Sequence, residues 1–289
     1  MKVVRIEGGI GNRMFQYALF RVIEETYGDA FLDETSFSPY LNHDAISLND
    51  IFPNILYKTT NLCSFKWQTK STVFYKIMRN LNESIGSKYI LEKEFKYYPS
   101  LIQSLPKKCY LRGFWQTEKY FSHIKTLLLN DLAFSKFSNL KNIQTAEEMF
   151  NEESVSIHIR KGLDYQKLAD YKGTCEREYY ERAIRFIEQK IKNPHFYLFT
   201  DNPKWVVDNI QNIKYTLVTW NPVMERNTYL DMQLMSQCKH NIIANSSYSW
   251  WGAWLNLNPQ KIVIAPKIWF NPSLGKRSTD IVPSSWIML

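Results

Sequence analysis

Four short stretches of the sequence hold residues of the kinds that bind phosphate groups and stabilise a leaving group. They are GGIGNR (8–13), HIRKG (158–162), TD (200–201) and NSSYS (245–249). Arginine can grip phosphate oxygens in a bidentate way, and serine hydroxyls with the free amides of a helix start can bind anions. The sequence has no D-x-D pair, no Walker P-loop and no G-x-S-x-G elbow, so it does not indicate the chemistry of those motifs.

The glycine-rich stretch follows an apolar segment and precedes a helical pattern. Adjacent glycines let the backbone approach a ligand, and the start of a helix favours a negative charge. Gly9 and Gly11 also give G-x-G, with Asp33 at about the distance, ~20 residues, of a ribose-binding acid in dinucleotide sites. Met14 replaces the third glycine of that motif. A dinucleotide site and a tight turn without a ligand both remain open interpretations.

The second stretch ends an apolar segment with three basic residues. Strand alternation places His158 and Arg160 on the same side, and Lys161 follows them. An unpaired buried arginine is costly, so these side chains are poor core material. A phosphate-binding arginine is one interpretation, and an ion pair with a helix is the other.

The last two stretches combine capping residues with possible ligand groups. Asp201 either caps the helix that begins at Pro203 or accepts hydrogen bonds from a base or ribose. Asn245, Ser246 and Ser247 form a strand-to-helix turn, and Ser249 is the expected N-cap. The tryptophans that follow are interpreted as packing residues.

Strands and helices must alternate to position these stretches, as in a parallel sheet covered on both faces. The expected strands are 2–6, 30–33, 109–113, 154–160, 195–201, 214–219, 240–244 and 261–266. The expected helices are 13–27, 118–128, 177–192, a helix from Pro203, 227–238 and 249–257. Residues 34–105 show weak periodicity. The sequence predicts an α/β protein with Rossmann-like domains at 1–150 and 151–289, divided near the polar stretch 141–153.

Composition limits the possible partners. The 36 Lys and Arg against 28 Asp and Glu give a net charge of +8, which attracts anions. Nucleic acid is not expected, because the basic residues are scattered and no nucleic-acid-binding motif appears. Four distant cysteines indicate neither a disulfide framework nor a zinc site, and no stretch approaches the ~20 apolar residues of a membrane span. We expect a cytoplasmic protein, with peripheral contact to the inner membrane face as an open possibility.

Several stretches together resemble the α-1,2-fucosyltransferases of glycosyltransferase family eleven. They are GGIGNRMFQYALF (8–20), LRGFWQTEKYF (111–121), VSIHIRKGLDY (155–165), LFTDN (198–202), DMQLMSQCKHNIIANSSYSWWGAWLN (231–256) and APKIWF (265–270). The resemblance implies a GT-B fold, in which two Rossmann-like domains face each other across a cleft. It also implies inverting, metal-independent transfer of fucose from GDP-β-L-fucose to the 2-OH of a galactose in a surface glycan or oligosaccharide. No cofactor is implied.

The resemblance gives the polar residues their expected roles. Arg160 would neutralise the β-phosphate of the GDP leaving group, and His158 would orient it or contact the donor. Ser246 and Ser247 would hold the diphosphate, with Asn245 and Ser249 supporting the turn. Asp201 would lie near the guanosine. The Gly8–Asn12 loop, with Gly9 and Gly11, would close the cleft from the other domain, with Asn12 near the fucose or the β-phosphate. The acceptor would lie against the N-terminal domain (1–150), and GDP-fucose would bind to the C-terminal domain (151–289).

Two departures from the family pattern affect the expected site. The family has H-x-R-R-G-D-Y, whereas this chain has Lys161 in place of the second Arg and an added Leu163 before Asp164. Arg13 replaces the usual Gln and adds a cation near the cleft. Asp164 and Asp33 are both candidates for the base that an inverting transfer needs. An NAD(P)-dependent oxidoreductase and a non-enzymatic glycan-binding module are the alternative functions.

Overall fold

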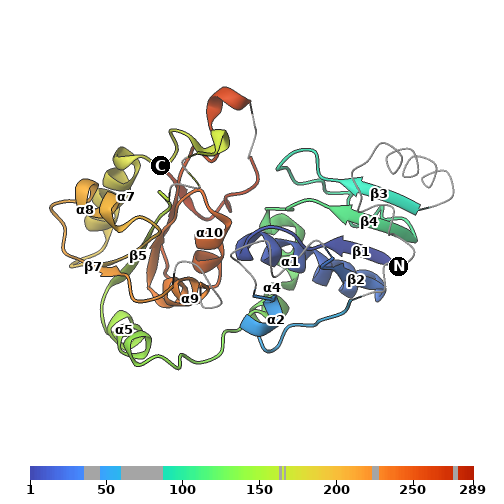
Figure 1. Ribbon diagram of the computed structural model, residues 1–289, viewed down its shortest axis with the longest axis horizontal. Coiled ribbons are helices and arrows are strands. Elements are labelled where there is room, and N and C mark those ends of the chain that lie inside the picture. Colours follow the sequence, from blue (N-terminus) through green and yellow to red (C-terminus); the bar gives the residue numbers. More distant parts are fainter. Residues whose placement is uncertain (36–45, 60–86, 163–164, 166, 223–227, 276–278) are drawn as a thin grey trace. The chain divides into compact units, whose positions relative to one another are not determined.

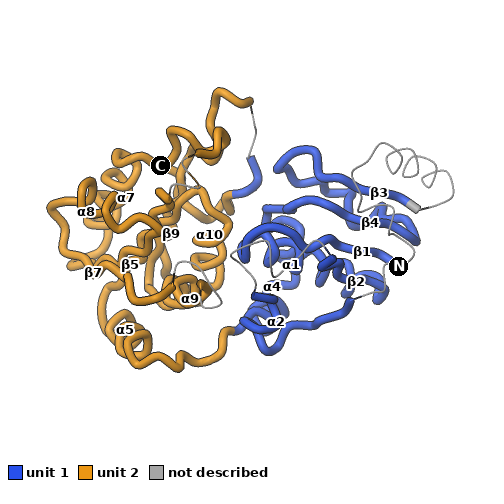
Figure 2. Tube along the Cα trace, viewed as in Figure 1, with its two compact units in different colours: residues 1–133, 279–281 blue, residues 134–278, 282–289 orange. Residues whose placement is uncertain are grey.

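The computed structural model of the chain has two compact units (Figure 2). Unit 1 comprises residues 1–133 and 279–281, and unit 2 comprises residues 134–278 and 282–289. The residues that the structure describes are 1–35, 46–59, 87–162, 165, 167–222, 228–275 and 279–289. Within these ranges, no helix is both long enough and apolar enough to cross a membrane.

Unit 1 is built on a four-stranded parallel sheet in the order β2-β1-β4-β3 (Figure 1). The strands are β1 (Lys2–Arg5), β2 (Ala30–Asp33), β3 (Ser87–Leu91) and β4 (Lys108–Arg112). The helices are α1 (Ile10–Tyr27), α2 (Leu48–Ile51) and α4 (Lys125–Asp131). The expected strands 2–6, 30–33 and 109–113 are confirmed in this sheet, whereas β3 falls in a region where the sequence indicated no element.

Helix α1 forms the β-loop-α opening that the sequence predicted. It begins at Ile10, three residues before the expected start at Arg13, and its apolar side packs on β1 and β2. Gly28 ends it in the left-handed conformation, φ 66°, and donates its amide to the carbonyl of Glu24, which satisfies an open carbonyl of the last turn. The expected helix over 118–128 is instead two 3-10 turns, η2 (Glu118–Tyr120) and η3 (Ser122–Ile124), followed by α4.

Unit 2 is built on a six-stranded parallel sheet in the order β10-β9-β8-β5-β6-β7. The strands are β5 (Ser154–Ile159), β6 (His195–Thr200), β7 (Tyr215–Val218), β8 (His240–Ile242), β9 (Val263–Ala265) and β10 (Ile287–Met288). The helices are α5 (Leu140–Asn151), α7 (Arg177–Lys190), α8 (Pro203–Asn209), α9 (Leu230–Gln237) and α10 (Ser247–Trp254). Short 3-10 turns lie at η4 (Ala169–Tyr171) and η5 (Pro272–Leu274).

Strand alternation divides the core of unit 2 into two apolar layers. Val155, Ile157 and Ile159 of β5 pack with α7 and α8 on one face of the sheet. On the other face, Tyr197 and Phe199 of β6 pack with residues of α5 and α9. The sheet is therefore covered on both sides, as its apolar strands predicted.

The boundary between the units differs from the expected division at 150/151. The polar stretch that indicated a linker is the helix α5, and its Met149 is fully buried against β6, β7 and α9. The hydrophilic composition of this stretch comes from the outer face of an amphipathic helix. Unit 2 therefore begins at Phe134.

Candidate functional site

The strand order of unit 2 marks one place in the sheet as the expected ligand site. From β5 the chain continues to β6 and β7 on one side, and then crosses to β8 on the other side of β5. In sheets of this kind, ligands bind at the carboxyl ends of the two strands where the order reverses. In this unit those ends carry Arg160 after β5 and the Asn245–Ser249 turn after β8. Two of the four predicted stretches thus meet at the switch point.

Arg160 is held by an acid from the neighbouring strand. Its Nη1 lies 2.5 Å from Oδ2 of Asp201, and Oδ1 of Asp201 accepts the backbone amide of Lys161 at 2.7 Å. The guanidinium also lies 5.5 Å from the ring centroid of Tyr165, and its side chain remains 32% exposed. The ion pair is therefore with a strand end, not with a helix, and it leaves part of the cation accessible to an anion.

Asp201 does not cap the helix that follows it. The N-cap of α8 is Asn202, whose side chain accepts the amide of Trp205 and donates to the carbonyl of Lys161 at 2.9 Å. Asp201 is thereby left to bind Arg160. Lys161 is buried, donates to the carbonyl of Thr174 and forms a 2.8 Å ion pair with Glu176, so its charge is already compensated within the protein.

His158 lies in the sheet beneath Arg160 as a neutral imidazole. Burial, with a smaller contribution from the charge of Arg160, lowers the pKa of His158 to about 3. Its Nδ1 has no hydrogen-bond partner among the described residues, and its ring centroid lies 5.6 Å from that of Tyr248. The Tyr248 hydroxyl accepts the amide of Met232 and donates to the carbonyl of Thr228, which joins α10 to the start of α9.

Asn245 is a buried structural centre of the turn after β8. Its Nδ2 donates to Oγ1 of Thr174 at 2.9 Å and to the carbonyl of Trp269 at 2.8 Å. Its Oδ1 accepts the thiol of Cys175, and its carbonyl accepts the hydroxyl of Tyr165 at 3.0 Å. With these partners, Asn245 fixes the backbone of the turn.

The serines of the turn divide into a cap, an open hydroxyl and a core residue. Ser246 is the N-cap of α10, and its hydroxyl accepts the amide of Tyr248. Ser247 begins the helix, and its hydroxyl makes no hydrogen bond within the described part of the chain. Ser249 is fully buried and donates to the carbonyl of Ser246. The prediction of Ser249 as N-cap, with a helix over 249–257, is therefore wrong by one short turn.

The tryptophans of α10 are packing residues, as their spacing indicated. Trp250 and Trp254 stack at 6.3 Å with an angle of 12° between their planes, and Trp251 is fully buried beside them. Trp286 also packs against Trp250, at 5.3 Å between centroids. This cluster fixes the axis of α10 and so the direction of its first turn.

A second switch point lies in unit 1, between β1 and β4. The loop Gly8–Asn12 follows β1, and Gln116 after β4 donates its Nε2 to Oδ1 of Asn12 at 2.7 Å. Gly8 has a φ of 84°, so it is the glycine that the turn requires, while Gly9 is the N-cap of α1 and Gly11 lies inside that helix. The position of Asn12 relative to a bound donor remains a prediction.

Two expectations for unit 1 need correction. Arg13 is only 1% exposed and donates to the carbonyl of Ile46, so it does not present a cation at the surface. Asp33 is also buried: it accepts the amide and hydroxyl of Thr35 and the hydroxyl of Tyr110. These bonds occupy both of its oxygens and argue against a role as ribose ligand or base. Asp164 and Leu163 lie outside the described residues.

Sequence reasoning missed two residues at the unit 2 site and a third, titratable residue in the same unit. Tyr165 and Tyr248 support Arg160 and His158, and their only signal was their position inside the motif stretches. Asp231 lies in the first turn of α9, where burial raises the pKa of its carboxyl to about 7 despite a 2.8 Å hydrogen bond from Asn221. Among the described residues, no group of three or more His, Cys, Asp or Glu side chains could hold a metal.

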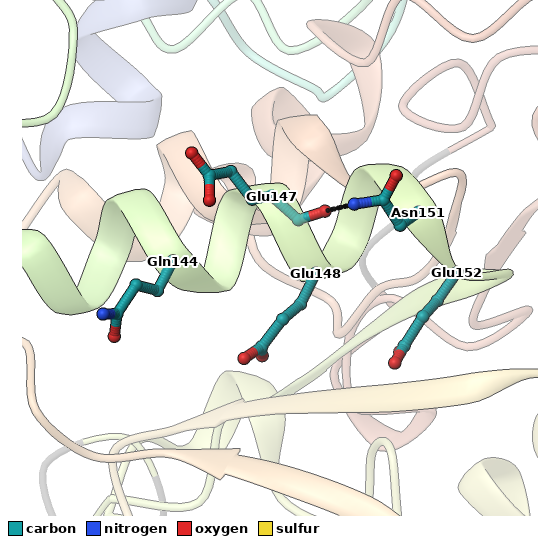
Figure 3. Close-up of a pocket in the computed structure, with 5 residues that line it drawn as sticks. All are labelled: Gln144, Glu147, Glu148, Asn151 and Glu152. Atoms are coloured by element: carbon teal, nitrogen blue, oxygen red, sulfur yellow. Dashed lines mark hydrogen bonds between the residues drawn. The ribbon is translucent and has the colours of Figure 1, made fainter.

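A pocket of about 380 Å³ lies elsewhere in unit 2, along α5 (Figure 3). Its lining is Gln144, Glu147, Glu148, Asn151 and Glu152. Three of these are acids, which would repel a phosphate. Glu152 pairs with His195, at the amino end of β6, whereas Arg160 and the 245–249 turn follow carboxyl ends. The acidic pocket is therefore separate from the candidate site.

Comparisons with known proteins agree with this arrangement. The sequence model of the family described as "Glycosyl transferase family 11" matches residues 1–289. The chain is 31% identical to an alpha-1,2-colitosyltransferase of Escherichia coli, covering 99% of this chain and 98% of the relative. It is also 31% identical to the O-antigen biosynthesis glycosyltransferase WbnK of Escherichia coli, covering 98% and 99%.

Solved structures give the same fold. The Bradyrhizobium fucosyltransferase NodZ matches with a TM-score of 0.52 at 14% identity, over 87% of this chain and 90% of that one. At this identity the match supports the fold alone, which is GT-B, with two parallel α/β sheets. Because the family match spans the whole chain, the conclusion is direct: this protein belongs to glycosyl transferase family 11, the family of the α-1,2-fucosyltransferases.

Proposed function

We propose that the protein transfers L-fucose from GDP-β-L-fucose to the 2-OH of a galactose in a surface glycan or oligosaccharide, with inversion and without a metal. The observation that carries the proposal is the position of Arg160. Arg160 is a partly exposed cation held by Asp201. It directly follows β5 at the switch point of unit 2, and the neighbouring strand β8 leads into α10. A nucleoside diphosphate is the anion that such a site accepts.

The reaction demands stabilisation of the leaving group. As the bond from the sugar to the β-phosphate breaks, negative charge grows on the phosphate and positive charge grows on the sugar ring. The Arg160 guanidinium neutralises the phosphate charge, and the start of α10 with the Ser247 hydroxyl holds the diphosphate. Burial lowers the pKa of His158 to about 3, so at neutral pH it adds no second charge beside Arg160.

The acceptor hydroxyl must lose its proton during the transfer. Asp33 is unsuited to this role because both oxygens are occupied within the protein. Asp164 remains the predicted base, on the motif HIRKGLDY alone. An NAD(P) site is not supported. In a dinucleotide site, Asp33 would have to bind the ribose, but Asp33 is buried.

The proposal is tested by incubation with GDP-fucose, EDTA and a panel of galactose-terminated acceptors, followed by NMR assignment of the linkage. We expect an α-1,2-linked fucoside that forms at the same rate with and without EDTA. Loss of turnover with EDTA, restored by a divalent cation, would overturn the metal-independent mechanism.

A second donor deserves a place in this test, because one relative is named a colitosyltransferase. Nucleotide-activated colitose should be offered beside GDP-fucose at equal concentration. A higher kcat/KM with colitose would assign the donor specificity of this chain to that sugar and would contradict the fucose proposal.

A further inference from the structure

The turn after β4 holds a bulky non-glycine residue in the left-handed conformation. Trp115 has a φ of 56° and is 1% exposed, and its Nε1 has no partner among the described residues. A left-handed non-glycine residue persists only where its surroundings hold it, and such residues concentrate at functional sites. The surroundings of Trp115 therefore merit a functional explanation.

Glu92, which directly follows β3, holds this turn. Its Oε2 accepts the amide of Phe114 at 2.6 Å and that of Trp115 at 3.0 Å. Gly113 makes room for the contact, because a Cβ built there would lie 2.4 Å from the Cβ of Glu92. Burial raises the pKa of the Glu92 carboxyl, while the two amide hydrogen bonds lower it. One acid thus fixes two successive amides.

The turn fixed by Glu92 brings an aromatic ring to the carboxyl end of β1. A Cβ built on Gly8 would lie 3.4 Å from Cε1 of Phe114, so this ring borders the loop that follows β1. Phe95 stacks beside Phe114 at 6.2 Å between centroids, with 8° between the planes. Both side chains are only partly buried.

The same turn orients two amide side chains. Gln116 donates its Nε2 to Oδ1 of Asn12, as described above. Within the described part of the chain, Oε1 of Gln116 accepts no hydrogen bond and Nδ2 of Asn12 donates none. The pair therefore offers an acceptor oxygen on Gln116 and a donor NH2 group on Asn12, both uncharged, beside the Phe114 ring.

We propose that Phe95, Phe114, Asn12 and Gln116 form the acceptor-binding surface, and that its ligand is a neutral pyranose ring with adjacent free hydroxyls. The C–H face of a sugar packs on an aromatic ring, while adjacent hydroxyls match a donor and an acceptor amide. Glu92 is a positioning residue that holds this surface in place. The inference rests on the proposed function and names the acceptor side of that reaction.

Steady-state kinetics of Phe114→Ala and Glu92→Ala test this surface. We expect the acceptor KM to rise about three- to tenfold for Phe114→Ala, and about tenfold or more for Glu92→Ala, which leaves the two amides without their acceptor. In both variants the KM for GDP-fucose should change much less than the acceptor KM. Glu94→Ala, at an exposed acid two residues away, is the matched control.

An acceptor analogue that lacks one hydroxyl gives a second readout. Removal of that hydroxyl should weaken binding to the wild type. It should weaken binding to Gln116→Ala much less, because that variant already lacks the hydrogen bond between the amide and the hydroxyl. Equal losses in both proteins would contradict the assignment of Gln116.

Failure of this surface and failure of the proposed function give different results. Acceptor binding is also measured directly, by saturation-transfer NMR with the galactose-terminated acceptor. If the wild type transfers no fucose but Phe114→Ala still abolishes acceptor binding, the surface stands and the donor assignment fails. Unchanged acceptor KM and unchanged NMR contacts in a folded Phe114→Ala protein would overturn the surface.

Discussion

Arg160 and Asp201 form an ion pair, 2.5 Å from Nη1 to Oδ2, that joins the carboxyl ends of two adjacent strands. Because Asp201 also accepts the amide of Lys161, it fixes both the backbone and the guanidinium of the residue to which we assign the phosphate. The pair converts a flexible arginine into a preorganised cation, and a preorganised charge stabilises a developing negative charge without reorganisation.

Asp201→Asn tests whether this orientation matters for the reaction. The amide can keep the bond from Lys161, but it loses the ion pair, so Arg160 becomes mobile. We expect kcat to fall about 10- to 100-fold, as for a misplaced catalytic group, with little change in thermal stability. Asp208→Asn, an exposed acid on α8, serves as the control and should leave kcat unchanged. A wild-type kcat in folded Asp201→Asn would contradict the positioning role.

We predict different outcomes for substitution of the two adjacent serines at the start of α10. Ser247→Ala removes a hydroxyl that has no partner within the described chain, so GDP affinity should fall at unchanged stability. Ser246→Ala removes the N-cap, and should reduce the free energy of unfolding by about 1 kcal/mol. Calorimetric titration with GDP and thermal unfolding separate the two effects. Equal GDP affinity of Ser247→Ala and the wild type would exclude its hydroxyl from the diphosphate site.

The lowered pKa of His158 predicts that the folded protein loses stability as the pH falls. The unfolded chain binds a proton near pH 6.5, whereas folded His158 remains neutral until the pH approaches about 3. Between these values the free energy of unfolding should decrease as the pH falls, by up to about 1.4 kcal/mol per pH unit. His158→Gln should remove this part of the slope, and His123→Gln, at an exposed histidine, should not. Denaturant unfolding across pH 3.5–6.5 measures it, and identical slopes would contradict the buried neutral state.

The raised pKa of Asp231 predicts the opposite trend, a free energy of unfolding that decreases as the pH rises. Its carboxyl has a folded pKa of about 7 against an ordinary value of 3.8, so the folded protein holds a proton that the unfolded chain releases. Stability from this group is complete below pH 3.8 and is lost as the pH rises through about 7. Asp231→Asn should therefore become progressively more stable than the wild type over this range. A stability difference that does not change with pH would contradict the raised pKa.

Much of this structure could be predicted from the sequence where local pattern decides it. The strands of unit 2 are apolar runs between helical patterns, so β5, β6 and β8 could be placed, and with them the turn that contains Asn245. The pairing of Arg160 with Asp201 could not be predicted, because it depends on the register between β5 and β6. The turn that Glu92 holds could not be predicted either, since β3 and Glu92 lie in a region without clear periodicity, and a positive φ at Trp115 leaves no mark in composition.

The predicted starts of helices were also misplaced where tertiary contacts, and not the local sequence, decide them. Ser246 and Ser249 are equally good N-caps by type, and only the tertiary contacts of Asn245 decide that the helix begins after Ser246. Arg13 was expected to add a cation near the cleft, but its side chain is buried and donates to the carbonyl of Ile46, a contact that the local sequence does not indicate.

The central claim is that Arg160 stabilises the departing GDP, and turnover of Arg160→Ala tests it most directly. Circular dichroism and thermal unfolding establish that the variant is folded, and Arg177→Ala, an exposed arginine on α7, is the control. The account predicts that kcat for GDP-fucose falls at least 10²–10³-fold, the typical cost of losing such a contact, while Arg177→Ala keeps wild-type turnover. Near-normal turnover in folded Arg160→Ala would contradict it.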